Sequence, residues 1–236
     1  MADFINTIDV LGDDAVVDGI ITGTITEFKD DTITEVGKSA FRDCAELEVV
    51  CFPNVTKALG NAFHRCRSLK SADLPNLTDA DAYLFSECES LSSVNLPKLT
   101  TITDNMFSYC AFQSIVLPSA TTFVDNSFTA FGFCKNLEVI DLPVCTSIPG
   151  GNHFNTCSAL RAFILRNTSA VCPLGNAGSF NNSGVAKGTG YIYVPRALVD
   201  SYKTATNWSA YASQFRALED HTVDGTITGA LDEDKI

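Results

Sequence analysis

The side chains best suited to chemistry in this 236-residue sequence are nine cysteines and three histidines. Thiols can ligate a metal or form disulfides. Six of the cysteines recur in one motif, F-x-x-C, at intervals of 22 to 24 residues. The motif residues are Phe41 and Cys44, Phe63 and Cys66, Phe85 and Cys88, Phe107 and Cys110, Phe131 and Cys134, and Phe154 and Cys157.

The spacing of these cysteines argues against a metal site. A structural metal needs ligands that converge, but the sequence has no C-x-x-C pair and no Cys/His cluster. Equivalent positions of successive repeats point the same way, which is a poor geometry for disulfides. We therefore expect no metal and no cofactor, and we expect the Phe and Cys of the motif to be structural core with reduced thiols.

Three further cysteines lie outside the motif. Cys51 is expected to face outward on a strand and is the best candidate for an exposed thiol. Cys145 takes a position that is apolar in the other repeats, and Cys172 has no clear place in the pattern.

Catalytic histidine chemistry is not indicated. His64 and His153 lie beside motif phenylalanines, and His221 lies near the acidic end of the chain. No Ser-His-Asp or Cys-His arrangement is suggested by these positions. The sequence therefore predicts a protein that is not an enzyme and has no catalytic residues.

Composition excludes two further classes of partner. Acidic residues number 28 against 16 basic ones, which gives a net charge of -12. Such a chain repels phosphate backbones and anionic lipid surfaces, so nucleic-acid binding is not expected. No apolar run approaches the roughly 20 residues of a membrane-spanning helix, so membrane insertion is not expected either. With 45% hydrophobic residues, the chain should fold.

The motif is part of a longer repeat. After each Cys comes a short apolar run, which ends in Pro in the first five units: Pro53, Pro75, Pro97, Pro118 and Pro143. Alternating apolar residues predict a short strand, and Pro ends its hydrogen bonding. Since one coil cannot bury its own apolar face, successive coils must stack. The fold class is therefore an α/β-type repeat solenoid with parallel β-strands and short helical turns on the convex side.

The ends of the array require caps. We assign residues 1–32 to an N-terminal cap, with a strand near 24–28. Residues 33–195 form the solenoid, with about six repeats plus a closing strand at 191–194. Residues 196–236 form a C-terminal helical cap and an acidic tail, with Trp208, Tyr211 and Phe215 on one helix face. The segment 17–23 nearly recurs as 223–229, and its role is left open.

The repeat resembles the BspA-type (Treponema-type) leucine-rich repeat of bacterial proteins, whose unit has about 23 residues. The F-x-x-C segments and the strand-ending prolines carry this resemblance over about two thirds of the chain, 33–195. The resemblance implies a curved parallel-β solenoid, often surface-associated, that is used for adhesion or recognition.

The candidate binding residues are those that flank the central apolar residue of each strand and face out of the sheet. Solenoids present such faces to their ligands. The residues are Val49, Cys51, Ser71, Asp73, Ser93, Asn95, Ser114, Val116, Val139, Asp141, Ala162 and Ile164.

Irregular units give a second pointer, because insertions in repeat arrays map to loops. The segment from Ala120 to Phe131 is three residues longer than its equivalents and contains Phe128. Phe128 and the nearby Phe133 are therefore candidate contact residues in a loop. The stretch 167–190, which is rich in Asn, Gly and Ser, is a second candidate for a protruding loop.

The leading hypothesis is a non-catalytic recognition or adhesion module that binds a protein or glycan on a cell surface. The first alternative is a structural or receptor-binding component of a phage tail, and the second is an intracellular protein-binding scaffold. The expected location is the cell surface, the extracellular space or a virion, with the cytoplasm as the alternative. The start of the chain has no basic, apolar secretion signal, and the oligomeric state is left open.

Overall fold

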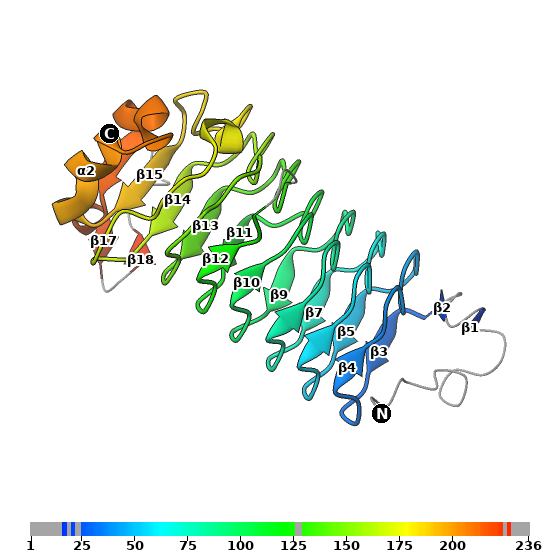
Figure 1. Ribbon diagram of the computed structural model, residues 1–236. Helices are drawn as coiled ribbons and strands as arrows, with labels where there is room; N and C mark the ends of the chain where they lie inside the picture. The colour runs from blue at the N-terminus through cyan, green and yellow to red at the C-terminus, as the bar shows by residue number, and fades with distance from the viewer. Residues whose placement is uncertain (1–15, 18–19, 22–24, 126–128, 224–225, 228–236) are drawn as a thin grey trace.

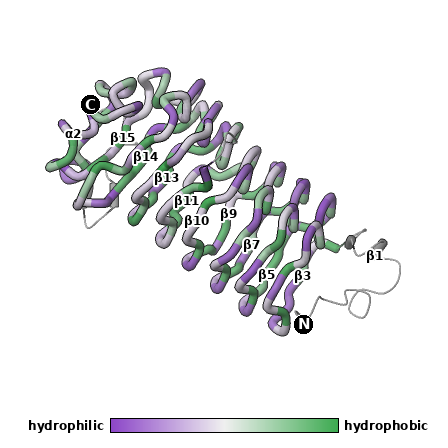
Figure 2. The backbone as a smooth tube through the Cα atoms, viewed as in Figure 1, coloured by the Kyte–Doolittle hydropathy of each residue, from purple (hydrophilic) through white to green (hydrophobic). Residues whose placement is uncertain are grey.

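The chain folds into a row of stacked coils in the computed structural model (Figure 1). The structure describes residues 16–17, 20–21, 25–125, 129–223 and 226–227. Hydrophilic and hydrophobic segments recur at similar places in successive coils (Figure 2). The parallel-strand solenoid that the repeat predicts is confirmed.

One side of every coil contributes a strand to a parallel ladder. The ladder consists of a four-stranded sheet, β3-β5-β7-β9, and a five-stranded sheet, β11-β13-β14-β15-β16. Its strands are β3 (Glu27–Lys29), β5 (Val49–Cys51), β7 (Ser71–Asp73), β9 (Ser93–Asn95), β11 (Ser114–Val116), β13 (Val139–Leu142), β14 (Ala162–Leu165), β15 (Tyr191–Val194) and β16 (Phe215–Ala217).

Shorter strands lie along another side of the coils, in a three-stranded parallel sheet, β4-β6-β8, and a two-stranded parallel sheet, β10-β12, and are together called the second ladder. Its strands are β4 (Glu35–Val36), β6 (Lys57–Ala58), β8 (Asp79–Ala80), β10 (Thr101–Ile102) and β12 (Thr122–Phe123). Two antiparallel hairpins lie outside both ladders. They pair β1 (Val16–Val17) with β2 (Ile20–Ile21), and β17 (Thr222–Val223) with β18 (Thr226–Ile227). The nearly repeated segments noted in the sequence are thus both built around hairpin strands.

The turn that carries each F-x-x-C motif uses short backbone bonds rather than a long helix. Within one coil the Cys44 amide donates to the Phe41 carbonyl at 3.2 Å, and the same contact recurs in later coils. The residue before each motif Cys has a positive φ, for example 61° at Asp43 and 63° at Arg65. Its amide therefore points to the next coil, where Asp43 donates to the His64 carbonyl at 2.9 Å.

The interior is a stack of phenylalanines that runs along the solenoid. Neighbouring rings in the stack are nearly parallel, with centroids 5.1 Å apart for Phe41 and Phe63 and 4.8 Å apart for Phe154 and Phe180. Offset stacking of this kind stabilises aromatic pairs beyond the burial of their area. The six motif phenylalanines are fully buried, and so is Phe180.

The six motif cysteines, here called the Cys column, are also buried. From Cys66 onward, each thiol donates to the carbonyl of the Phe one coil before the Phe of its own motif; Cys66 reaches the Phe41 oxygen at 2.9 Å and Cys88 the Phe63 oxygen at 3.0 Å. A thiol is a small apolar group with one weak donor, which suits a buried site beside a backbone oxygen. Burial raises the pKa of the Cys44 thiol to about 12.

The stretch 167–190 is not a protruding loop, contrary to the expectation. It contains the 3₁₀ helix η2 (Ala177–Phe180), and Phe180, Ser183 and Val185 are all buried. The segment from Phe180 to Ser183 reads F-x-x-S and occupies the place of the motif in one more coil. Phe180 continues the Phe stack beyond Phe154, so this polar stretch forms one more coil of the solenoid.

The C-terminal segment contains several short helices. They are η3 (Arg196–Leu198), α2 (Val199–Thr204), η4 (Trp208–Gln214) and η5 (Leu218–Asp220). Trp208 and Tyr211 lie on η4, but Phe215 belongs to β16 instead of a helix face. The backbone turns extended at Phe215, and β16 pairs in parallel with β15. The cap therefore adds a strand to the ladder and covers it with helices.

Candidate functional site

The first ladder presents two outward columns of side chains, because successive residues of a strand point to opposite faces. Parallel pairing in register aligns Val49 with Ser71 and Ser93, and Cys51 with Asp73 and Asn95. The register also adds Glu27 and Lys29 on β3, which the sequence reading placed in a cap. We call the two columns together the sheet face.

The sheet face is open from β3 to β11. Ser93, Asn95, Ser114 and Val116 are exposed, and Val116 is 56% exposed. Four further predicted residues on this part of the face are half-buried: Val49, Cys51, Ser71 and Asp73. We call this part the open face.

The same face is closed from β13 onward, which corrects part of the prediction. Ala162 is fully buried and Ile164 is 2% exposed, and both pack with Tyr193 in a small cluster of their own. Leu218 from η5 packs against this cluster, because the chain beyond β16 folds over the face. We call the part from β13 to β16 the covered face.

Two further predicted residues lie on the covered face. Asp141 is 8% exposed and accepts two hydrogen bonds from Arg166, at 2.7 and 3.0 Å through one carboxylate oxygen. Val139 is half-buried and packs against the cluster of Ala162 and Ile164. Arg216 lies over the Tyr191 ring at 4.0 Å, a cation–π contact on the neighbouring strands.

An irregularity in the repeat divides the open face between β9 and β11. These two strands follow each other in the first ladder but belong to separate sheets. The run from Cys110 to Phe112 is one residue shorter than the run from Cys88 to Leu91. The Ala111 amide consequently bonds the Leu91 carbonyl at 2.9 Å, and the strand register shifts at this step.

One polar row crosses the three middle strands of the open face, β5, β7 and β9. The Cys51 thiol lies 3.5 Å from a carboxylate oxygen of Asp73, and the Asn95 amide donates to the other oxygen at 2.7 Å. Burial, followed by the contact with Asp73, raises the pKa of Cys51. Lys29 pairs with Glu27 at 2.6 Å, and that hydrogen bond raises the pKa of Lys29.

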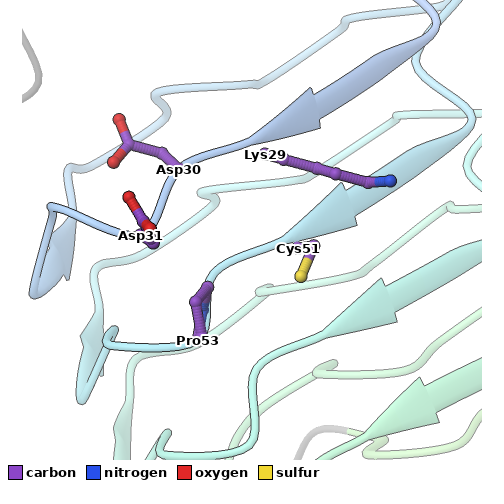
Figure 3. A pocket seen from close by; sticks show the side chains of 5 residues that line it. All are labelled: Lys29, Asp30, Asp31, Cys51 and Pro53. Atoms are coloured by element: carbon purple, nitrogen blue, oxygen red, sulfur yellow. The ribbon is translucent and has the colours of Figure 1, made fainter.

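A shallow pocket of about 310 Å³ lies beside this row (Figure 3). Lys29, Asp30, Asp31, Cys51 and Pro53 line it. The Asp30 carboxylate is already hydrogen-bonded within its own loop, because it accepts a hydrogen bond from the Thr32 amide at 2.7 Å. The pocket therefore offers one ammonium group, one acidic side chain and one thiol at the edge of a broad flat surface.

The predicted loop contacts have different outcomes. Phe128 lies outside the described residues. Phe133 is half-buried and stacks on Tyr109, with ring centroids 4.6 Å apart and an interplanar angle of 4°. Tyr109 is 45% exposed, and the sequence reading missed it. Its position one residue before Cys110, equivalent to that of Phe133 before Cys134, was the available signal.

The described part of the chain holds no group of three or more His, Cys, Asp or Glu side chains that could bind a metal. His64 and His153 are buried beside backbone carbonyls, at 3.1 Å from the Ser86 oxygen and 3.2 Å from the Pro149 oxygen. Burial lowers the pKa of both histidines. Both histidines are therefore side chains packed in the interior of the fold.

The comparisons agree with this fold. Residues 23–130 match the model of the BspA type leucine rich repeat region, in six copies. No curated protein matches the chain. Among solved structures, a leucine-rich repeat protein from Bacteroides ovatus is similar, with 21% identity and a TM-score of 0.56 over 75% of this chain and 50% of that one.

Two other bacterial structures show weaker similarity. A leucine rich cell surface protein from Faecalibacterium prausnitzii has 21% identity and a TM-score of 0.43, over 62% of this chain and 58% of that one. The leucine-rich repeat protein of T. pallidum has 25% identity and a TM-score of 0.46, over 60% of this chain and 82% of that one. The chain thus spans between half and three fifths of the length of the first two of these structures.

Proposed function

Because residues 23–130 are a BspA-type leucine-rich repeat region, we propose that this chain is a non-catalytic recognition module that binds a protein through its open face. The observation that carries the proposal is the contrast along the first ladder of strands. The cap folds over Ala162 and Ile164, whereas Ser93, Asn95, Ser114 and Val116 stay exposed at equivalent positions.

The shape of the open face favours a broad partner. Its outward side chains from β5 to β11 are small or of medium size, and the pocket at its edge, whose lining residues are drawn in Figure 3, is shallow. Small-molecule sites are usually concave and enclose most of their ligand, whereas protein interfaces cover about 800 Å² on each partner. A flat surface across several strands fits the second kind of ligand.

The chemistry of the open face supports the same choice. The described strands β3 to β11 place no aromatic side chain on it, so it lacks the rings that sugars stack on. Charged residues are few, with Glu27 and Lys29 paired to each other. Recognition would therefore depend on shape and on hydrogen bonds that Ser and Asn donate or accept and that Asp accepts.

A second candidate is glycan binding at Tyr109 and Phe133. These stacked rings lie on the motif turns, away from the sheet, and Tyr109 is 45% exposed. Aromatic side chains at surfaces are common contact residues. Asn105 and the Thr129 hydroxyl lie nearby and bond to each other at 3.1 Å, and they could supply polar contacts for a sugar.

We further propose a location at the cell surface or on a particle, because a recognition face is useful where partners are met. In the described part of the chain, no helix is long and apolar enough to span a membrane. Fractionation of the native culture, with mass spectrometry of each fraction, tests the location. Peptides confined to the cytosol would favour the intracellular scaffold, and peptides in particles would favour the phage-tail component.

Binding is tested with the labelled full chain on an array of purified extracellular proteins and glycans. The double variant Ser93→Arg, Ser114→Arg places two large charges on β9 and β11, where the outward residues of the open face are exposed. We expect it to weaken binding to a protein spot at least tenfold and to leave the melting temperature unchanged. Ser209→Arg is the matched control, since Ser209 is exposed on η4 of the cap.

The outcome on the array separates the two candidates. Loss of glycan binding in Tyr109→Ala, with no effect of the arginine pair, would favour the aromatic site over the sheet face. Protein binding that survives the arginine pair would contradict the proposed face.

A further inference from the structure

Cys145 and Cys172 are two buried thiols that meet between neighbouring coils. Their sulfur atoms lie 4.0 Å apart, and the two side chains are 1% and 0% exposed. The Thr146 amide bonds the Thr121 carbonyl at 2.8 Å, which aligns the coil of Cys145 with the coil before it, and Ile148 bridges to Leu174 in the coil that follows. Cys145 therefore takes the place that Ala120 has in the coil before.

This pair differs from the Cys column in what its sulfurs contact. In the Cys column, the thiols from Cys66 onward each donate to a backbone oxygen, at 2.9 to 3.3 Å. Cys145 and Cys172 have only longer backbone contacts, 3.6 Å to the Ser147 oxygen and 3.9 Å to the Pro173 oxygen. Their nearest polar partner across the coils is each other.

The environment makes the two sulfurs unequal. The contact with Cys172 lowers the pKa of Cys145, and the same contact raises the pKa of Cys172. Thiolate is the nucleophile in thiol–disulfide exchange. Cys145 is the sulfur suited to attack first, because its two chain neighbours, Val144 and Thr146, line a surface pocket.

A route to Cys145 is visible at the surface. A pocket of about 470 Å³ is lined by its two chain neighbours, Val144 and Thr146, together with Pro143 and the loop from Arg166 to Ser169. Val144 is 42% exposed. A small molecule in this pocket is one residue away from the pair, and a local opening would bring it into contact.

The second cysteine is held by the C-terminal cap. The Cys172 amide donates to the Tyr202 hydroxyl at 2.9 Å, and the Trp208 ring nitrogen donates to the Cys172 carbonyl at 2.7 Å. A covalent bond from Cys172 to Cys145 would therefore tie the cap to the solenoid at the covered end of the sheet.

We propose that Cys145 and Cys172 are a redox-active dithiol that forms a disulfide staple by exchange with a small-molecule disulfide. The Cys145 thiolate attacks one sulfur of that disulfide and releases one thiol, which leaves a mixed disulfide on Cys145. The Cys172 thiolate then attacks the Cys145 sulfur and releases the second thiol. The two cysteines lose two electrons and two protons, and the small disulfide gains both.

The staple should raise thermal stability. It joins two residues that are 27 positions apart, and this cross-link lowers the conformational entropy of the unfolded chain. For a protein of this size, we expect the melting temperature to rise by about 6–12 °C on oxidation.

The test uses the full chain with Cys51→Ser, which removes the half-exposed thiol and leaves eight cysteines of the nine. The folded protein is incubated with 2-hydroxyethyl disulfide, and thiols are counted after denaturation. We expect six, with mass spectrometry showing one link from Cys145 to Cys172, and the rise in melting temperature reversed by reductant. Eight remaining thiols, a persistent mixed disulfide, or a link between other cysteines would overturn the proposal.

Two variants guard against an unrelated stabilising effect. Cys145→Ala copies the residue at the equivalent position of the preceding coil, and it should keep all seven of its thiols and show no rise in melting temperature. Cys157→Ala removes a member of the Cys column and should retain the link and the rise. A rise that persists in Cys145→Ala would contradict the staple even if both variants fold less stably.

Discussion

The open face and the covered face share one backbone arrangement but differ in the exposure of their outward side chains. Both are parallel ladders in register, with alternate side chains pointing outward. Over β3 to β11 the outward residues remain accessible, and Val116 is 56% exposed. Over β14 and β15 the outward residues Ala162, Ile164 and Tyr193 are buried beneath Leu218.

The difference shows that a repeat determines the interior of a solenoid more strictly than its surface. Every coil must fill the same inner positions because each packs on its neighbours. Outward positions are free to vary, so they can serve a partner at one end and the cap at the other. β14 and β15 accordingly have hydrophobic or aromatic side chains on both faces, as buried strands do.

The largest predicted effect tests whether the interiors of the two halves are equivalent. Phe63 lies under the open face and Phe154 under the covered face, and both are fully buried in the Phe stack. Truncation to Ala should lower the free energy of unfolding by about 3–5 kcal/mol at each site, because a large cavity remains. Urea unfolding of the two variants measures this.

A loss below about 1 kcal/mol at Phe63 would mean that this Phe is not core. A much smaller loss at Phe63 than at Phe154 would show that the cap, rather than the repeat, stabilises the solenoid. Ser209→Arg on the cap surface should change the free energy of unfolding by less than about 0.5 kcal/mol and serves as the baseline.

Much of the fold could be predicted because its signal is periodic. The F-x-x-C motif and the apolar runs place the strands and the inner residues without knowledge of distant contacts. The cover over Ala162 and Ile164 could not be predicted in this way, since it depends on where η5 lies after the chain has turned. The continuous apolar run from Ala162 to Leu165 was the local sign that both faces are buried.

Other features were missed because a single residue breaks the pattern. Ser183 replaces Cys in the motif after Phe180, so the last polar coil looked like a loop. Phe215 fits a helical spacing but pairs in β16, because tertiary pairing outweighs a weak local preference. Tyr109 occupies the position before a motif Cys that is polar in most of the other units, so only its equivalence to Phe133 marked it as a contact residue.

The second prediction compares one column at its two ends. Ile164→Ala should lower the free energy of unfolding by about 2–4 kcal/mol, because Ile164 is 2% exposed beneath the cap. Val116→Ala removes methyl groups from the same column where it is exposed, and should cost less than about 0.5 kcal/mol. Equal losses, measured by urea unfolding, would show that the two faces are not different environments.

The third prediction is smaller and concerns pH. Burial lowers the folded-state pKa of His64, under the open half, and of His153, under the covered half. Above the unfolded pKa of about 6.5, both states are neutral and the stability is fully present. As pH falls below this value, the unfolded chain binds protons first, so stability declines until the folded pKa is reached.

Each histidine should therefore lower the free energy of unfolding as the pH falls from 7.5 to 5.5, because the unfolded chain takes up the proton more readily than the folded one. The urea midpoint at the two pH values measures the loss, and His64→Gln and His153→Gln should each reduce it. A midpoint that rises as pH falls would contradict the burial of neutral histidines. A change confined to one variant would show that the two halves differ in their interior as well as on their face.

The smallest predicted effect is on the reactivity of Cys51. This thiol lies on the open face, whereas the other eight cysteines are buried in the interior. Iodoacetamide should label it first in the folded chain, because the other eight of the nine cysteines are buried. Labelling should be slow, since burial and the Asp73 carboxylate raise its pKa. Asp73→Asn should accelerate labelling a few-fold. Asp79→Asn is the control and should not, because Asp79 is an exposed carboxylate on β8. If a motif cysteine reacts before Cys51, or Asp73→Asn slows labelling, the open face does not present this thiol as described.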